Sequence, residues 1–140
     1  MKDHKIPYYI SMITLLLAWA LLIHITWLGL YPYEPLVINR VTILGDTFQR
    51  GGLLMYEIDF CKNMDISATV AKHFEDGILY RLRSEESHLE KGCHVKTIAL
   101  EIPHNMPIGK YKLCSSATYH VNQIRDITVK YSTEEFEVIE

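Results

Sequence analysis

The sequence predicts a mainly β protein, with one N-terminal transmembrane α-helix followed by an immunoglobulin-like antiparallel β-sandwich of about seven strands. Two observations support this fold class. Residues 6–33 contain no Asp, Glu, Lys or Arg, and from residue 36 onward β-rich segments alternate with turn residues at roughly ten-residue spacing. We therefore divide the chain into a cytoplasmic N-terminus (1–9), a transmembrane helix (10–31), a linker (32–35) and the sandwich domain (36–140).

The apolar segment 10–31 has the length and the aromatic residues of a membrane anchor. About 20 apolar residues cross a bilayer core of ~30 Å, because a helix rises ~1.5 Å per residue. Trp27 and Tyr31 lie at the far end of the segment, and such rings favour the level of the lipid headgroups. Trp19 and His24 lie inside it, and we interpret His24 as a neutral imidazole within the anchor. The lipid bilayer is therefore the first expected partner.

The charges that flank this segment predict its direction. Lys2 and Lys5 precede it, and the next basic residue is Arg40. Because basic residues stay cytoplasmic, we expect a single-pass signal-anchor with the C-terminal domain in the periplasm or outside the cell. A cleaved signal peptide is the alternative, with Ala18–Ala20 as its A-x-A site. The anchor is favoured, because the apolar run exceeds the ~7–15 residues of ordinary signals.

The charge of the expected outer part argues against nucleic acid as a partner. Residues 34–140 carry 16 acidic and 12 basic side chains, so their net charge is −4. Nucleic-acid-binding domains instead carry a basic patch or stripe. The 107 residues of this part suffice for one domain with a modest core.

Strands account for nearly all of the expected outer domain. In one of them, Leu54, Tyr56, Ile58 and Phe60 lie on one face, which is expected to point to the core, and alternate with Glu57, Asp59 and Cys61 on the other. A hairpin turn is expected at residues 75–77, a loop or helical turn at 84–91, and a bulge in the last strand near 132–133. The expected strands are Leu36–Leu44, Leu53–Cys61, Ile66–Phe74, Ile78–Arg83, Cys93–Ile102, Gly109–Val121 and Asp126–Ile139.

A turn before one strand resembles a feature of immunoglobulin-like domains. Pro107 and Gly109 are followed by Tyr111, as in the corner where a Tyr hydroxyl bonds back to the main chain. An ordinary half-buried strand Tyr is the alternative. Both tryptophans lie in the anchor, so no core Trp is available. An Ig-like topology is therefore expected, without the features of an antibody domain.

Three cysteines lie in the outer domain, where an oxidising compartment favours pairing. Strand phase favours a Cys61–Cys93 disulfide between neighbouring strand ends, with Cys114 as a free thiol. The alternative, Cys61–Cys114 across two sheets, conflicts with the phase: Phe60 and Leu113 point to the core. Both pairings remain open from the sequence alone.

The sequence contains no pattern that predicts an enzyme or a cofactor. The seven histidines include no pair at H-x-x-x-H spacing, which a helical zinc site requires. The fold could still assemble a metal site from His94, His104, His120 and a Met. Ser115 and Ser116 lack a nucleophile elbow. We therefore predict no catalytic, cofactor or metal residues.

Several short motifs occur in an order that covers nearly the whole chain. They are Tyr31–Pro35, Tyr56–Lys62, Gly92–Cys93, Pro107-x-Gly109-x-Tyr111-x-Leu113, Val121–Asn122, Arg125 and Thr133-Glu134-x-Phe136-x-Val138. In this order the chain resembles single-pass membrane-anchored Ig-like β-sandwich proteins of tailed bacteriophages. The resemblance implies an anchored sandwich in which Cys61 and Cys93 are partners; Cys114 is not part of the pattern. It implies no particular activity.

The sequence is most consistent with an anchored binding or interaction module with a protein partner at the envelope. In a phage setting, it would act on the host envelope. A structural or assembly subunit, including a homo-oligomer, is the alternative, and a metal-binding envelope protein is the third. Partner-binding residues are expected in three loops: Asn63, Met64 and Asp65; His104, Asn105 and Met106; Asn122, Gln123 and Arg125.

Overall fold

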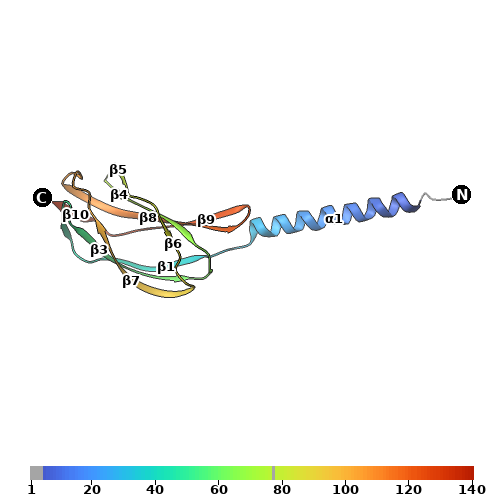
Figure 1. The fold of residues 1–140 in the computed structure, drawn as a ribbon, viewed down its shortest axis with the longest axis horizontal. Helices are drawn as coiled ribbons and strands as arrows, with labels where there is room; N and C mark the ends of the chain where they lie inside the picture. The colour runs from blue at the N-terminus through green and yellow to red at the C-terminus, as the bar shows by residue number, and fades with distance from the viewer. Residues whose placement is uncertain (1–4, 77) are drawn as a thin grey trace. The chain divides into compact units, whose positions relative to one another are not determined.

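The computed structural model describes residues 5–76 and 78–140, and it is mainly β with one N-terminal apolar helix (Figure 1). Contacts between Cα atoms divide the chain into two compact units. One unit contains the residues up to Pro32 together with Asn122–Arg125, and the other contains Tyr33–Val121 and Asp126–Glu140. The first four residues of the expected cytoplasmic segment, and Gly77 of the expected hairpin turn, lie outside the described residues.

Helix α1 (Lys5–Leu30) is longer than the expected 10–31, because it begins before the aromatic pair Tyr8–Tyr9. Its segment Tyr8–Leu30 has a mean hydropathy of 2.0 and no buried part, so it is long and apolar enough to cross a membrane. Its two threonine hydroxyls bond to the helix itself: Thr14 Oγ1 donates to Ser11 O and Thr26 Oγ1 donates to Leu22 O, each at 2.8 Å. These two hydroxyls are thus satisfied within the helix, as a lipid environment favours.

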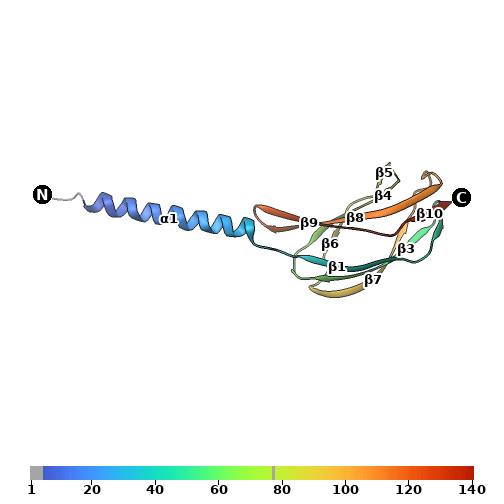
Figure 2. The same cartoon turned by 180° about the vertical axis from the view of Figure 1, so that it is seen from behind.

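The first sheet has the order β1-β3-β7 in the described part of the chain, and both pairings are antiparallel. Its strands are β1 (Leu36–Ile43), β3 (Leu53–Lys62) and β7 (Gly92–Glu101). The register of β1 on β3 shifts between Ile38 and Arg40, which marks a bulge. Figures 1 and 2 show this sheet as the layer that contains β1, β3 and β7.

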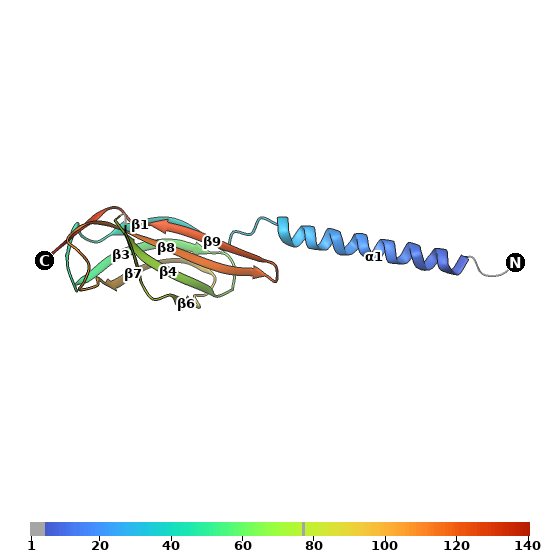
Figure 3. The same ribbon diagram turned by 90° about the horizontal axis from the view of Figure 1, so that it is seen from above.

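The second sheet has the order β2-β10-β8-β4-β5, with β6 paired to β4 and β9 paired to β8. The pairing of β2 with β10 is parallel, whereas the pairings of β10 with β8 and of β8 with β4 are antiparallel. Figure 3 looks onto this layer and shows β9, β8 and β4 side by side. Its strands are β2 (Thr47–Gln49), β4 (Ala68–Glu75), β5 (Leu79–Arg81), β6 (Glu85–Ser87), β8 (Gly109–Asn122), β9 (Arg125–Ser132) and β10 (Phe136–Ile139).

The core lies between the two sheets and follows the alternation of the sequence. In β3, the expected core residues Leu54, Tyr56, Ile58 and Phe60 are all buried. They join the main core cluster, whose other fully or largely buried members are Phe74, Ile102, Met106, Tyr111, Leu113, Phe136 and Val138. This packing holds the two layers together through apolar burial.

The structure corrects three expectations about the strands. The expected last strand is two strands, β9 and β10, separated at Thr133, whose Oγ1 accepts a hydrogen bond from Leu113 N at 3.1 Å. The short strand β2 was not expected, and neither was β6 within the expected loop 84–91. Both have three residues and fall in polar sequence, where periodicity carries no signal.

Two local features fix the ends of the sandwich. Tyr111 OH donates to Pro107 O at 2.9 Å, so the Tyr111 side chain bonds back to the main chain four residues upstream. Cys61 and Cys93 lie directly opposite each other in the β3–β7 register and form a disulfide. Leu113 is buried in the core, whereas Cys114 alternates away from it and is a free cysteine.

Candidate functional site

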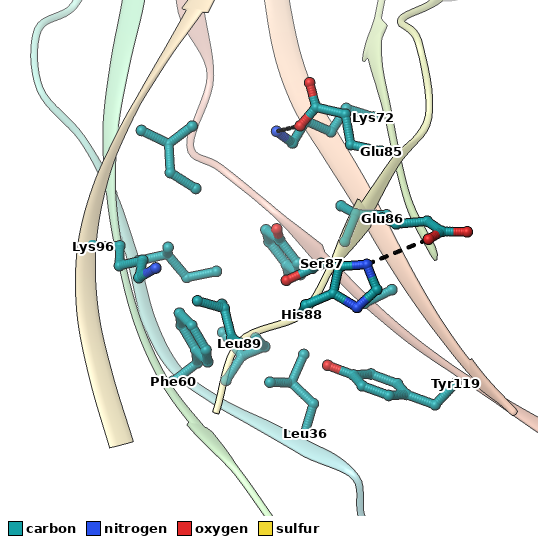
Figure 4. A pocket seen from close by; sticks show the side chains of 16 residues that line it. Leu36, Phe60, Lys72, Glu85, Glu86, Ser87, His88, Leu89, Lys96 and Tyr119 are labelled. Carbon is teal, nitrogen blue, oxygen red and sulfur yellow. Dashed lines mark ion pairs between the residues drawn. The ribbon is translucent and has the colours of Figure 1, made fainter. Parts of the chain in front are cut away.

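A pocket of about 440 Å³ lies between the two sheets of the sandwich (Figure 4). Its walls come from both layers and from the connection between β5 and β7. The lining residues are Leu36, Ile38, Ile58, Phe60, Val70, Lys72, Glu85, Glu86, Ser87, His88, Leu89, Lys96, Ile98, Ala117, Tyr119 and Tyr131. Its volume falls within the range of ~300–1,000 Å³ that is typical of small-molecule sites.

Small core-facing residues explain why a space remains here. Ala68 in β4 and Ser115 and Ala117 in β8 are buried, yet they fill little volume. At the other end of the same strands, Phe74 and Tyr111 fill the layer between the sheets. At the end near Ala117, a second and smaller buried cluster contains Ala68, Ala117 and Tyr119, so the pocket lies beside smaller side chains than those at the Phe74 end.

Residues 82–91, named the strap here, connect the second sheet to the first and cover the pocket. At one end, Leu82 N donates to Lys72 O at 2.9 Å, and β6 pairs with β4. At the other end, the buried Lys62 donates through Nζ to Leu89 O. Figure 4 shows Ser87, His88 and Leu89 crossing the pocket. The strap thus contributes wall residues, although only three of its residues are in a strand.

A polar group lies among the apolar walls. Burial raises the pKa of Tyr131, which lines the pocket. Burial, followed by the neighbouring Tyr131, raises the pKa of Tyr56 well above its ordinary value. Tyr131 interacts with the buried Tyr56 hydroxyl and with Ser115, which lie behind the pocket wall. The site therefore combines a largely apolar lining with two tyrosine side chains, Tyr119 and Tyr131.

Charged pairs lie at the rim of the pocket. Lys72 Nζ is 3.8 Å from Glu85 Oε2, and His88 Nε2 is 3.4 Å from Glu86 Oε2, as Figure 4 marks. The Lys72 side chain is 11% exposed, whereas the Glu85, Glu86 and His88 side chains are about 70% exposed. Apolar walls with a few polar groups around them are typical of small-molecule sites.

The sequence-predicted loop residues lie apart from this pocket lining. Asn63, Asp65, His104 and Asn105 are exposed, and Met64 is half-buried. Met106 is wrong as a partner-binding residue, because its side chain is fully buried in the main core cluster. An apolar residue between Pro103 and Pro107 faces the core here, although its polar neighbours indicated a surface loop.

The third predicted loop belongs to the same compact unit as α1. Asn122 Nδ2 donates to Leu28 O at 2.9 Å, and Arg125 donates to Gly29 O at 2.8 Å. These donors satisfy carbonyls that the end of a helix leaves without an intrahelical partner. Gln123 is exposed. Asn122 and Arg125 thus have structural contacts that the sequence analysis did not foresee.

The predicted anchor residues all lie on the apolar helix or directly after it. Trp19, His24 and Trp27 are exposed along α1, and the Trp27 ring lies 5.3 Å from that of Tyr31.

Two of the histidines considered for a metal site have different partners. His94 Nε2 contacts Glu90 O at 3.0 Å, and His120 Nδ1 contacts Asp126 Oδ1 at 2.5 Å.

The sequence did not predict the pocket, although it contains the small residues that lie beside it. Ala68 and Ala117 are buried on two paired strands, where Ala68 is the register partner of Tyr119 and Ala117 is that of Val70. That juxtaposition depends on the β4–β8 register, which the sequence does not contain. Most residues of the strap are polar, so the sequence predicts an ordinary loop there.

Comparisons with known proteins give no family for this chain. No protein-family profile matches the sequence, and no curated protein matches it. Similar solved structures include the alkylpurine DNA glycosylase AlkC of Pseudomonas fluorescens, with 10% identity, a TM-score of 0.45 and coverage of 82% of this chain and 33% of that chain.

Two further structures are similar at the same level. The sporulation control protein Spo0M of Bacillus subtilis has 9% identity, a TM-score of 0.40 and coverage of 76% and 50% of the two chains. A β-glucosidase of Listeria innocua has 14% identity, a TM-score of 0.41 and coverage of 77% and 16%. This chain spans at most half the length of these proteins.

Proposed function

We propose that the protein is a membrane-anchored binding module, held outside the cytoplasm, that takes an apolar group of an envelope protein into the pocket between its sheets. The observation that supports this most strongly is the pocket itself, with its apolar walls and charged rim. The site is not proposed to be catalytic, and no cofactor is invoked. The resemblance to phage proteins implies that this partner belongs to the envelope of the host.

The anchor is the second part of the proposal. Segment Tyr8–Leu30 is apolar on all sides, and large side chains such as Leu17, Ile23 and Trp27 are exposed along it. An apolar surface of this extent is costly in water and favourable in lipid. We place the N-terminus in the cytoplasm, because Lys2 and Lys5 precede the span.

We also assign the sandwich to the immunoglobulin-like class. Three features support this assignment: the β1-β3-β7 and β10-β8-β4 orders, the parallel pairing of β2 with β10, and the Tyr111–Pro107 hydrogen bond. The disulfide differs from that of antibody domains, because it joins neighbouring strands of one sheet. In this class, loops and edges carry binding functions on a rigid scaffold.

Site-specific photo-cross-linking in native membranes tests the proposed site. A photoreactive residue at position 88, on the pocket rim, is compared with one at position 120. The side chains of His88 and His120 are 70% and 73% exposed, so the two positions are matched for exposure. We expect position 88 to capture an envelope protein and position 120 to capture none.

A pocket-filling variant completes the test. Ala117 is buried in the pocket wall, so Ala117→Leu reduces the space. It should abolish capture from position 88, while Ala71→Leu, on the opposite face of the paired strand, should not. Equal capture from both positions, or capture unchanged by Ala117→Leu, would contradict the proposal. Capture of further copies of this chain alone would favour the structural, homo-oligomeric alternative.

A further inference from the structure

A cluster of three metal-ligating side chains lies on the outer face of the second sheet, away from the pocket. His73 in β4 is the register partner of Cys114 in β8, and Glu75 is two residues further along β4. Because side chains alternate along a strand, His73 and Glu75 lie on the same face. That face is opposite to the one on which Phe74 is buried in the core.

The three side chains converge at one point. One ligand atom from each of them lies within 4.8 Å of the others, and Cys114 Sγ is 3.3 Å from Glu75 Oε2. His73 and Cys114 are half-buried, whereas Glu75 is exposed. The cluster is therefore held by two paired strands and remains accessible from solvent.

The charges of this cluster argue against a nucleophilic role for the thiol. Burial, and then the neighbouring Glu75 carboxylate, raise the pKa of Cys114. A reactive cysteine requires the opposite shift, because the thiolate is the nucleophile. A cation between the two groups would instead be attracted by both the carboxylate and the thiolate, and it would replace the thiol proton.

We infer that His73, Glu75 and Cys114 form a Zn²⁺ site, with water in the fourth position. An imidazole nitrogen, a carboxylate oxygen and a thiolate are the donors that zinc prefers, and three protein ligands leave one coordination position open. Lys112 is the register partner of Glu75, and Arg81 is that of His73. The positive charges of Lys112 and Arg81 lie beside the site and should lower its affinity for Zn²⁺ by repulsion, while the three ligands stay in place.

Metal titration of the full-length chain tests this site. The protein is purified in detergent with its disulfide intact, stripped of metal, and titrated with Zn²⁺ by calorimetry. We expect one ion per chain, and an affinity at least ~10-fold lower in His73→Gln, Glu75→Gln and Cys114→Ser. His120→Gln is the matched control, because His120 is an exposed histidine that pairs with the Asp126 carboxylate, apart from the cluster.

A second readout separates loss of a ligand from loss of the fold. Zn²⁺ should slow the alkylation of Cys114 in the unmodified chain, because the bound thiolate is withdrawn from reaction. Co²⁺ should give the charge-transfer absorption of a thiolate ligand, and Cys114→Ser should remove it. The site would be overturned by non-saturable binding, by an affinity unchanged in Cys114→Ser, or by alkylation that Zn²⁺ does not slow. All these results are independent of what the pocket binds.

Discussion

Tyr111 shows how one hydroxyl can fix a corner of the sandwich. Its ring is buried, and its hydroxyl donates to Pro107 O at 2.9 Å. Tyr111→Phe keeps the ring but removes this bond, and should therefore lower the free energy of unfolding by ~1 kcal/mol. Urea denaturation of the two proteins measures the difference. Tyr80→Phe is the control, because its ring lies 6.1 Å from Tyr111 and does not carry this bond; an equal loss in both variants would contradict the assignment.

The Cys114 thiol should react slowly and with a distinctive pH dependence. Burial, and then Glu75, raise its pKa, so less thiolate is present at a given pH than in the unfolded chain. Glu75→Gln removes the negative charge and should speed alkylation by iodoacetamide at pH 8 in the presence of a chelator. Lys112 lowers the same pKa, so Lys112→Gln should slow the reaction. Shifts in the same direction for both variants would contradict this electrostatic explanation.

At the scale of the elements, the disulfide ties β3 to β7. The two cysteines are 32 residues apart in the sequence. Closing a loop of this length restricts the unfolded chain, and its removal should cost ~3–4 kcal/mol of stability. Replacing both Cys61 and Cys93 by Ala should lower the midpoint of urea denaturation accordingly.

Cys114→Ser is the control for this pair, because Cys114 is outside the disulfide. It should leave the urea midpoint nearly unchanged. If the double variant is as stable as the unmodified chain, the bridge contributes little to the sandwich.

The long elements could be predicted from the sequence, because their patterns are local. The uncharged run predicted α1, and the alternation of Leu54, Tyr56 and Ile58 predicted the face that β3 buries. The separation of β9 from β10 could not be predicted, since it depends on the bond between Thr133 and Leu113. The three-residue strands β2 and β6 exist only through their pairing partners.

The pocket and the metal cluster depend on which strands are neighbours. His73 and Cys114 are distant in the sequence and meet only through the β4–β8 register. Similarly, the strap becomes a wall of the pocket through contacts such as Lys62 with Leu89. Neither the register nor these contacts has a signature in local composition. The expected loops, in contrast, were chosen for polarity, which located exposed residues such as His104 but misassigned Met106.

At the scale of the whole molecule, the central claim is that a membrane span holds the β domain outside the cytoplasm. Impermeant thiol labelling of intact cells tests this claim directly. Two single-thiol variants are compared in a Cys114→Ser background that retains the disulfide: Asp3→Cys before the span and Ser132→Cys after it. Ser132 is exposed at the end of β9, so a thiol there is accessible on a folded domain.

We predict that a maleimide unable to cross the cytoplasmic membrane labels position 132 in intact cells. Position 3 should react only after permeabilisation, because basic residues near the N-terminus stay in the cytoplasm. Both proteins should remain in the membrane fraction after a wash that removes peripheral proteins. Labelling of position 3 but not position 132 in intact cells, or release of the β domain from the membrane, would contradict the account.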